Sequence, residues 1–420
     1  MMFAIRGKLV QLILPFFYFL SSYGTAVLRY PWMLRLLLLI IVGLLLPARS
    51  PSTTMVVGLS EASSSSRPSP QQPQQPRPRI ALVTGANKGI GYEIVQKLGS
   101  EHLDNDPTTK AFVCILGCRD AALGRAAVEK LQESNERNNP TAFEFVRIDL
   151  LDPDSIMEAV HTIQQKYGRL DVLINNAAVC YNDPTLYGKL ATPASFAEQA
   201  QITIDTNFFG TLAVTQAMLP LLLPTRDQQT QPLNTKNHSY IPRIINIASS
   251  AGRLALLPTQ ERREIFASNT LQLEELQELM HDFVKSAQTG QHVEDGWPNT
   301  GYGVSKIGII ALTKLFARRY GCTSPHPRNP DDDQSSATVE DDTTEKQKQP
   351  TSASPVLLIN SVDPGYCATD QNQYHGTNSA AQGATTPFLL ATIRPEWTAP
   401  PDQLAAYTGK HWYEEHEIAW

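Results

Sequence analysis

A tyrosine and a lysine four positions apart, Tyr302 and Lys306, are the residues of this chain whose types and spacing best fit proton-transfer chemistry. Apolar residues recur after them at helical spacing, and residues four apart share one face of a helix. A free phenol has a pKa of about 10, and a neighbouring ammonium favours its phenolate form. A tyrosine so placed could exchange a proton with a substrate oxygen near neutral pH. By itself, the same pattern also fits an ordinary pair on a helix surface.

A second stretch is suited to holding a nucleotide. Residues 80–83 form a short apolar run typical of a buried strand, and residues 92–98 have apolar residues at helical separations. Between them, Gly85, Gly89 and Gly91 follow the spacing G-x-x-x-G-x-G, so they lie in a strand-to-helix turn. Glycines there let the backbone approach a pyrophosphate, whose charge the free N–H groups of the helix N-terminus would meet. Three glycines alone would equally fit a simple packing turn.

Segments of strand and helix character alternate along most of the chain. Apolar runs predict strands at residues 80–83, 111–116, 143–150, 170–174, 243–247 and 355–362. Helical spacing predicts helices at residues 92–98, 121–136, 153–167, 271–284 and from 302 onward, and residues 206–211 are expected to open another. This alternation predicts an α/β fold with a doubly wound, mostly parallel sheet of the Rossmann type. Chemistry in such a fold is expected beyond the carboxyl ends of the strands.

Taken in order, these motifs resemble those of the short-chain dehydrogenase/reductase family. The matching segments are residues 84–91 (T-G-x-x-x-G-x-G), 175–178 (N-N-A-A for the family's N-N-A-G), 246–252 (N-x-S-S-x-x-G), 302–306 (Y-x-x-x-K) and 364–369 (P-G-x-x-x-T). The resemblance covers residues 80–420. It implies an oxidoreductase that uses a nicotinamide cofactor.

The resemblance also implies roles for four catalytic candidates, Asn207, Ser249, Tyr302 and Lys306. Hydride transfer to a carbonyl carbon leaves negative charge on the oxygen, which Tyr302 would protonate while the Ser249 hydroxyl holds it in place. Lys306 would lie under the phenol and the nicotinamide ribose, and Asn207 would anchor a water of the proton relay. Ser249 is preferred to Ser250 because it occupies the family's serine position. A serine pair after a strand is otherwise commonly a helix cap.

The choice of cofactor depends on Arg119, which lies just beyond the second predicted strand, where the adenosine ribose is expected. An arginine there, helped by Lys88, would pair with a 2′-phosphate, so NADP is favoured over NAD. Asp120 beside it leaves open a solvated surface arginine. The expected cofactor contacts are Gly85, Asn87, Lys88, Gly89, Ile90, Gly91, Arg119, Asp149, Leu150, Asn176, Ala177, Tyr302, Lys306, Pro364, Gly365 and Thr369.

The chain carries a long insert before the tyrosine, with more than 50 residues between Ser249 and Tyr302. Within the insert, at residues 253–300, the helix expected at 271–284 would be capped by Asn269 and has one apolar face formed by Leu273, Leu276, Met280 and Phe283. This length resembles the monomeric carbonyl reductases and the plant menthone and salutaridine reductases. It implies a helix that walls the substrate cleft and covers the surface used for association, hence a monomer. A role in core packing is compatible with both.

Unusual sequence precedes the predicted catalytic domain, residues 79–420, and also interrupts it. Residues 1–50 contain two apolar runs and predict a membrane anchor or, with translation from Met33, a cleaved signal segment. Residues 51–78 are rich in Ser, Pro and Gln and predict a disordered tether. Residues 323–354, with two acidic runs, predict a disordered loop. We therefore expect a membrane-associated protein, in the endomembrane system or endoplasmic reticulum.

Composition excludes several other classes. A formal net charge of −6 without a basic stripe argues against nucleic acid binding. The five cysteines are scattered and form no disulfide framework or zinc-ligand spacing, so no metal is expected. The expected activity is NADPH-dependent reduction of a small-molecule ketone, aldehyde or quinone. Alternatives are an NAD-linked alcohol or hydroxysteroid dehydrogenase and a non-catalytic, membrane-tethered NADP-binding protein.

Overall fold

The computed structural model describes residues 77–103, 106–134, 143–181, 195–223, 240–321, 357–393, 404 and 406–420. The predicted anchor at 1–50, nearly all of the predicted tether at 51–78 and the predicted loop at 323–354 lie outside these ranges. Within them, no helix is both long enough and apolar enough to span a membrane.

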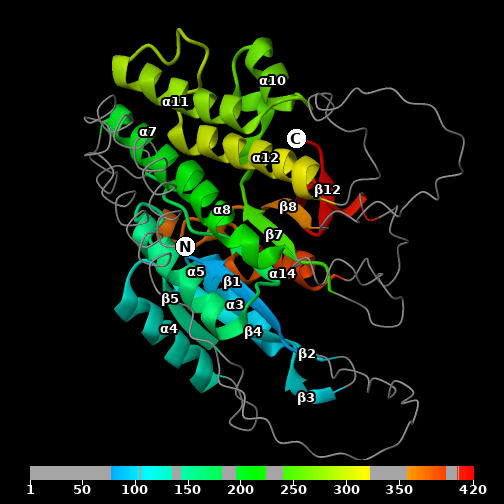
Figure 1. Ribbon diagram of the computed structural model, residues 1–420. Helices are drawn as coiled ribbons and strands as arrows, with labels where there is room; N and C mark the ends of the chain where they lie inside the picture. The colour runs from blue at the N-terminus through cyan, green and yellow to red at the C-terminus, as the bar shows by residue number, and fades with distance from the viewer. Residues whose placement is uncertain are drawn as a thin grey trace, which may run out of the picture. The chain divides into compact units, whose positions relative to one another are not determined.

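An eight-stranded sheet forms the centre of the described chain (Figure 1). In spatial order its strands are β12 (His416–Ile418), β11 (His411–Tyr413), β8 (Leu358–Asp363), β7 (Arg243–Ile247), β6 (Val172–Asn175), β1 (Arg79–Thr84), β4 (Phe112–Cys118) and β5 (Phe143–Arg147). Neighbouring strands run parallel except the β11–β12 pair. The predicted doubly wound, mostly parallel sheet is confirmed.

The central strands are buried and mostly apolar because helices cover both faces of the sheet. All six residues of β1 are buried. Successive side chains of a strand point to opposite faces, so Ile80 and Leu82 enter one apolar core while Ala81 and Val83 enter the other. Alternate residues of one short run thereby join two separate helix layers to the sheet.

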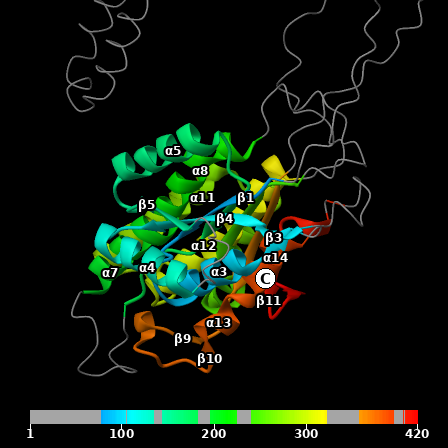
Figure 2. The same ribbon diagram turned by 90° about the horizontal axis from the view of Figure 1, so that it is seen from below.

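The helices form one layer on each face of the sheet (Figure 2). One core takes side chains from α3 (Gly89–Ser100), α4 (Ala121–Ser134) and α14 (Thr385–Thr392). The other takes side chains from α5 (Pro153–Tyr167), α7 (Phe196–Ile204), α8 (Thr211–Leu222), α10 (Gln260–Ala267), α11 (Leu273–Thr289) and α12 (Gly301–Tyr320). Smaller elements are β2 (His102–Leu103), β3 (Asp106–Lys110), β9 (Cys367–Ala368), β10 (Asn378–Ser379), α13 (Ala380–Gly383) and short 3-10 turns at Ser250–Gly252, Leu254–Leu256 and Asp370–Asn372.

The helix predicted at residues 153–167 is confirmed with both of its ends. Asp152 caps α5, where its Oδ1 accepts from the backbone N–H of Asp154 at 3.1 Å and of Ser155 at 3.3 Å. Gly168 ends the helix in the left-handed region, with φ of 68°. Local capping chemistry was sufficient to define this element.

The prediction that residues 206–211 open a helix is wrong. The helix begins earlier, at α7, where Ser195 and Glu198 form a capping box. It then continues without interruption through a π-helical segment, Asp205–Gly210, into α8. The physical reason is that the preceding turn already satisfies the N–H groups that a helix start at Thr206 would leave exposed.

The insert folds as α10 and α11, which lie over α12 (Figure 1). The predicted apolar face is confirmed, since Leu273, Leu276, Met280 and Phe283 are all buried in the core. The predicted cap is wrong. Gln272, not Asn269, precedes the helix, and its backbone N–H donates to the Glu275 carboxylate at 2.8 Å. Glu275 lies three residues beyond Gln272, in the first turn of the helix, and its carboxylate accepts the backbone N–H that precedes the helix.

Candidate active site

The glycine turn has the geometry of an anion-binding loop. Gly85 and Gly89 lie in the left-handed region, with φ of 65° and 56°. A Cβ on Gly91 would come within 2.5 Å of Asn176 Nδ2 and 2.7 Å of the Gly85 carbonyl oxygen, so only glycine fits. Lys88 precedes α3 without a side-chain cap, which leaves the first N–H groups of this helix for an anion. These residues fit the pyrophosphate of a dinucleotide.

The segment after β6 braces this turn, as expected for Asn176 and Ala177. Their backbone N–H groups both donate to Thr84 Oγ1 at 3.0 Å, and Asn176 Nδ2 donates to the Thr84 carbonyl at 2.9 Å. Ala178 replaces the family's glycine without strain, because the residues with positive φ in the described chain do not include it. Two strand ends distant in sequence are thus joined beneath the turn.

The two residues expected to select NADP lie on adjacent segments. The Gly85 N–H donates to the Gly117 carbonyl at 2.7 Å, which places the end of β4 against the glycine turn. Arg119 is exposed, and Asp120 beside it accepts from the Leu123 N–H at 2.9 Å and so caps α4. The carboxylate that could have neutralised Arg119 therefore has a structural role.

Lys88 is paired with a partner that the sequence did not suggest. Its ammonium donates to the Asp370 carboxylate. Asp370 follows Thr369, and a Cβ on Gly89 would lie 3.4 Å from the Thr369 methyl carbon. The loop after β8, including Pro364 and Gly365, is thereby held against the glycine turn.

The remaining cofactor candidates lie near the same edge of the sheet. Asp149 is partly buried after β5, and its Oδ1 accepts from the Leu151 N–H at 3.1 Å. Leu150 lies against Gly210 so closely that a Cβ there would approach the Leu150 Cβ to 2.6 Å. Asn87 and Ile90 belong to the glycine turn and the first turn of α3, and Ile90 packs in the apolar core below it.

Three of the four catalytic candidates meet at the carboxyl end of β7. Ser249 is partly buried, accepts from the Ala251 N–H at 3.2 Å, and its hydroxyl hydrogen-bonds the Tyr302 side chain. Lys306 is 3% exposed, donates to the Ile247 carbonyl at 2.7 Å, and its Nζ lies 5.4 Å from the centre of the Tyr302 ring. The preferred serine is the one in contact, since Ser250 is exposed.

Burial governs the charge of this cluster. It lowers the pKa of Lys306 to about 8 and raises the pKa of Tyr302, which nearby Cys180 and Asp363 raise further and Ser249 lowers. This is opposite to the shift of Tyr302 expected from the lysine alone, because loss of solvent destabilises the phenolate. A phenol that keeps its proton at neutral pH is suited to donate it.

Asn207, the fourth candidate, is buried in the π-helical segment and connects two parts of the site. Its Oδ1 accepts from the Val179 N–H at 2.8 Å, while its Nδ2 donates to the Val179 carbonyl at 2.9 Å and to Ser305 Oγ at 3.1 Å. Ser305 is the neighbour of Lys306. A π-helical turn, which is frequent at functional sites, directs this amide inward.

Sequence reasoning missed Cys180 and Asp363 as site residues. The Cys180 side chain hydrogen-bonds that of Gln371 and interacts electrostatically with Tyr302 and Lys306. Asp363 is 3% exposed and also interacts with both. Its place at the carboxyl end of an apolar run was an available signal. Nothing in the local pattern marked Cys180.

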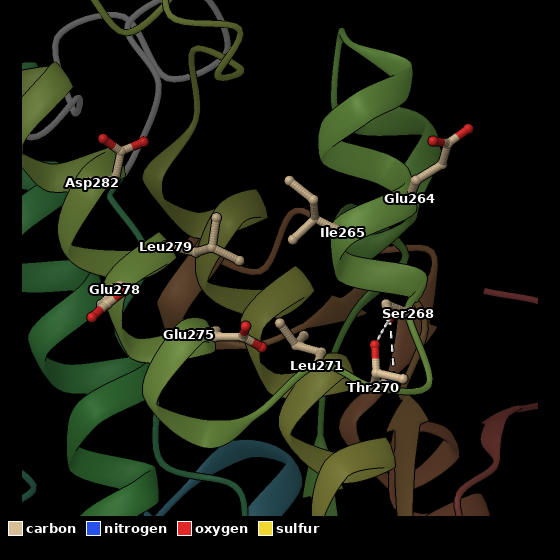
Figure 3. A pocket seen from close by; sticks show the side chains of 9 residues that line it. All are labelled: Glu264, Ile265, Ser268, Thr270, Leu271, Glu275, Glu278, Leu279 and Asp282. Atoms are coloured by element: carbon tan, nitrogen blue, oxygen red, sulfur yellow. Dashed lines mark hydrogen bonds between the residues drawn. The ribbon is translucent and has the colours of Figure 1, made fainter.

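A groove of about 600 Å³ lies in the insert, lined by residues of α10, of α11 and of the segment between them (Figure 3). Carboxylates of Glu264, Glu275, Glu278 and Asp282 border apolar side chains of α10 and α11. None of the four catalytic candidates lines it. Across the described residues, no group of His, Cys, Asp and Glu side chains is arranged to hold a metal ion.

A doubly wound sheet with a dinucleotide turn and a Tyr–Lys pair with a buried lysine at one edge defines a class of nucleotide-binding oxidoreductase folds. The short chain dehydrogenase family model matches residues 79–258. Carbonyl reductase (NADPH) 1 of Rattus norvegicus is 33% identical over 325 residues, which cover 77% of this chain and 94% of that protein. The chain belongs to the short-chain dehydrogenase family.

Solved structures support the same fold. Salutaridine reductase from Papaver somniferum aligns with a TM-score of 0.57 at 24% identity, covering 80% of this chain and 99% of that one. Menthone neomenthol reductase from Mentha piperita aligns with a TM-score of 0.55 at 25% identity, covering 81% and 99%.

Proposed function

We propose that this chain is an NADPH-dependent carbonyl reductase that reduces a ketone, aldehyde or quinone to the alcohol or hydroquinone. The observation that carries the proposal is the meeting of Ser249, Tyr302 and Lys306 at the carboxyl end of β7, at the same edge of the sheet as the glycine turn. The name of the rat relative, an NADPH carbonyl reductase, supports the same activity and cofactor.

Each residue of the cluster has a separate role in carbonyl reduction. NADPH, when bound, supplies hydride to the carbonyl carbon. The Tyr302 hydroxyl donates its proton to the carbonyl oxygen, and the Ser249 hydroxyl donates a hydrogen bond that holds this oxygen. Lys306, with a pKa of about 8, is mostly an ammonium at pH 7 and stabilises the negative charge that Tyr302 acquires. Asn207 fixes Val179 and Ser305 around this pair.

NADP(H) is the proposed cofactor. The glycine turn and the uncapped start of α3 would hold the pyrophosphate, and Arg119 with Lys88 would hold the 2′-phosphate. An NAD-linked dehydrogenase is less supported, because the exposed residue directly after β4 is the cationic Arg119, and the neighbouring Asp120 carboxylate caps α4. A non-catalytic binding protein would have no use for the intact proton-transfer cluster.

The proposal extends to location and assembly. The apolar runs within residues 1–50 support attachment to a membrane, in the endomembrane system or endoplasmic reticulum. The packing of α11 on α7 and α12 supports a monomer, since it covers apolar helix surface that another subunit would otherwise cover.

The test is NADPH oxidation by the full chain with a panel of ketones, aldehydes and quinones. We expect turnover by the wild type and a loss of about 10²- to 10⁴-fold in Tyr302→Phe, because the phenol's proton is removed. Tyr320→Phe, at the other end of α12, is the matched control and should behave as wild type. Both variants should bind NADPH normally, and undiminished turnover in Tyr302→Phe would refute the mechanism.

A further inference from the structure

A buried carboxylate lies beside the proton-transfer pair without an assigned role. Asp363 is the last residue of β8 and is 3% exposed. Strands β7 and β8 run parallel with Ile247 opposite Val362, and the Ala248 N–H donates to the Val362 carbonyl at 2.7 Å. Asp363 therefore ends its strand at the level where the turn carrying Ser249 begins.

The Asp363 carboxylate joins the two turns that flank the site. Its Oδ1 accepts from the Gly365 N–H at 3.0 Å, in the loop after β8. It also accepts from the Ser250 N–H, in the turn after β7. The two backbone donors hold this nearly fully buried carboxylate in a fixed position and favour its ionised form.

The Lys306 ammonium needs a compensating charge, because burying a lysine without one is costly. The hydrogen bond that its Nζ donates goes to a neutral carbonyl, that of Ile247. The titratable groups that act on it are Cys180, after β6, and Asp363, after β8, while Tyr302 lies on its own helix. Burial raises the pKa of the Cys180 thiol, so this group is neutral at pH 7.

Asp363 thus supplies the negative charge near Lys306. Its other titratable neighbours are Arg253, at the end of the turn after β7, and the Cys367 thiol, which stays neutral because burial raises its pKa to about 11. Burial raises the pKa of Asp363, whereas its two backbone donors, Arg253 and Lys306 lower it and so favour the ionised form. Two cations around one buried carboxylate are consistent with a charged aspartate in the working pH range.

We propose that the Asp363 carboxylate is the counter-ion of the Lys306 ammonium and thereby sets the pH range in which Tyr302 donates its proton. Asp363 is a positioning residue, since it acts on the reaction through Lys306 and Tyr302. This inference rests on the proposed function. Because Asp363 raises the pKa of both Lys306 and Tyr302, removal of its carboxylate should lower both pKa values.

The experiment replaces Asp363 by Asn, which keeps an oxygen for the Gly365 and Ser250 N–H groups but removes the charge. For carbonyl reduction, the alkaline limb of the kcat/KM profile should move to lower pH by about one unit, with near wild-type rates at the acidic end. Asp363→Glu, which keeps the negative charge, should retain the wild-type profile. Glu278→Gln, an equal charge change in the insert, should leave it unmoved.

A second readout does not depend on turnover. In the cofactor-free protein, the ¹³Cε resonance of Lys306, assigned by its absence from Lys306→Arg, should titrate about one pH unit lower in Asp363→Asn. If that variant does not fold, Asp363→Ser serves as the second neutral replacement. An unchanged Lys306 titration in a folded neutral variant overturns the inference. If the wild type reduces no carbonyl, the proposed function is refuted instead. The Lys306 titration would still show whether Asp363 acts as its counter-ion.

Discussion

At the scale of single residues, two adjacent serines show how environment divides roles between identical side chains. Ser249 and Ser250 both follow β7, but Ser249 is partly buried and contacts Tyr302, whereas the Ser250 side chain is exposed. The contribution of Ser250 is its backbone N–H, which donates to Asp363. Only the Ser249 hydroxyl can therefore reach a substrate oxygen at Tyr302.

Replacement of Ser249 by Ala should lower kcat by about 10²-fold, because a hydrogen-bond donor to the developing oxyanion is removed. Ser250→Ala keeps its backbone N–H and should remain within about twofold of wild type. Single-turnover NADPH oxidation measures both. Equal losses in the two variants would show that the turn as a whole, and not the Ser249 hydroxyl, matters.

At the scale of elements, the glycine turn depends on what approaches it from other strands. Gly91 is in ordinary helical conformation at the start of α3, so its requirement for glycine is not conformational. It comes from Asn176, after β6, and from the Gly85 carbonyl, both of which occupy the space of a Cβ. The turn is thus completed by a segment 85 residues further along the chain.

Gly91→Ala should force these neighbours apart, with a cost of about 1–3 kcal/mol in the free energy of unfolding and a loss of NADPH affinity. Gly290→Ala is the control: Gly290 ends α11 at φ of 73° with no atom near its would-be Cβ, so it should cost about 1 kcal/mol and leave NADPH affinity unchanged. Urea unfolding and fluorescence titration with NADPH separate the two effects. Wild-type affinity in Gly91→Ala would contradict the steric argument.

At the scale of the whole molecule, the C-terminal strands complete the sheet beside the catalytic strands. β11 pairs with β8, and His411 lies opposite Ser361 with its Nδ1 2.9 Å from the Ser361 Oγ. His411 is 3% exposed, and burial lowers its pKa to about 4. In the unfolded chain a histidine titrates near 6.5, so folding disfavours its protonation.

This pKa makes the stability of the fold depend on pH. Above about pH 6.5 the histidine is neutral in both states and its contribution is complete; as pH falls from there toward 4, the unfolded state takes up the proton and stability is lost. At pH 5 the loss should be about 2 kcal/mol. Urea unfolding of wild type and His411→Asn at pH 7 and pH 5 tests this, with His161→Asn, at an exposed site on α5, as control. Equal pH dependence in wild type and His411→Asn would contradict it.

Much of the fold was predictable because its signals are local. The apolar run before Gly85, the Asp152 cap and Gly168 end of α5 and the amphipathic face of α11 each depend on a few consecutive residues. What could not be predicted depends on contacts between distant segments. The strands β11 and β12 are three residues each and form only by pairing, β11 with β8 and β12 with β11, and the π-helical turn at Asn207 reflects its bonds to Val179 and Ser305.

The sequence by itself determined the class of fold, the glycine turn and the pairing of Tyr302 with Lys306, because strand and helix periodicity and an i, i+4 separation are properties of the local chain. Only the tertiary structure decided that Lys88 is paired with Asp370 and that Asp363 and Cys180 lie near Tyr302 and Lys306. These groups lie far apart in sequence and meet only when parallel strands bring their carboxyl ends to one edge. There, burial and neighbours that no local pattern specifies change the pKa values of Tyr302, Lys306 and Asp363.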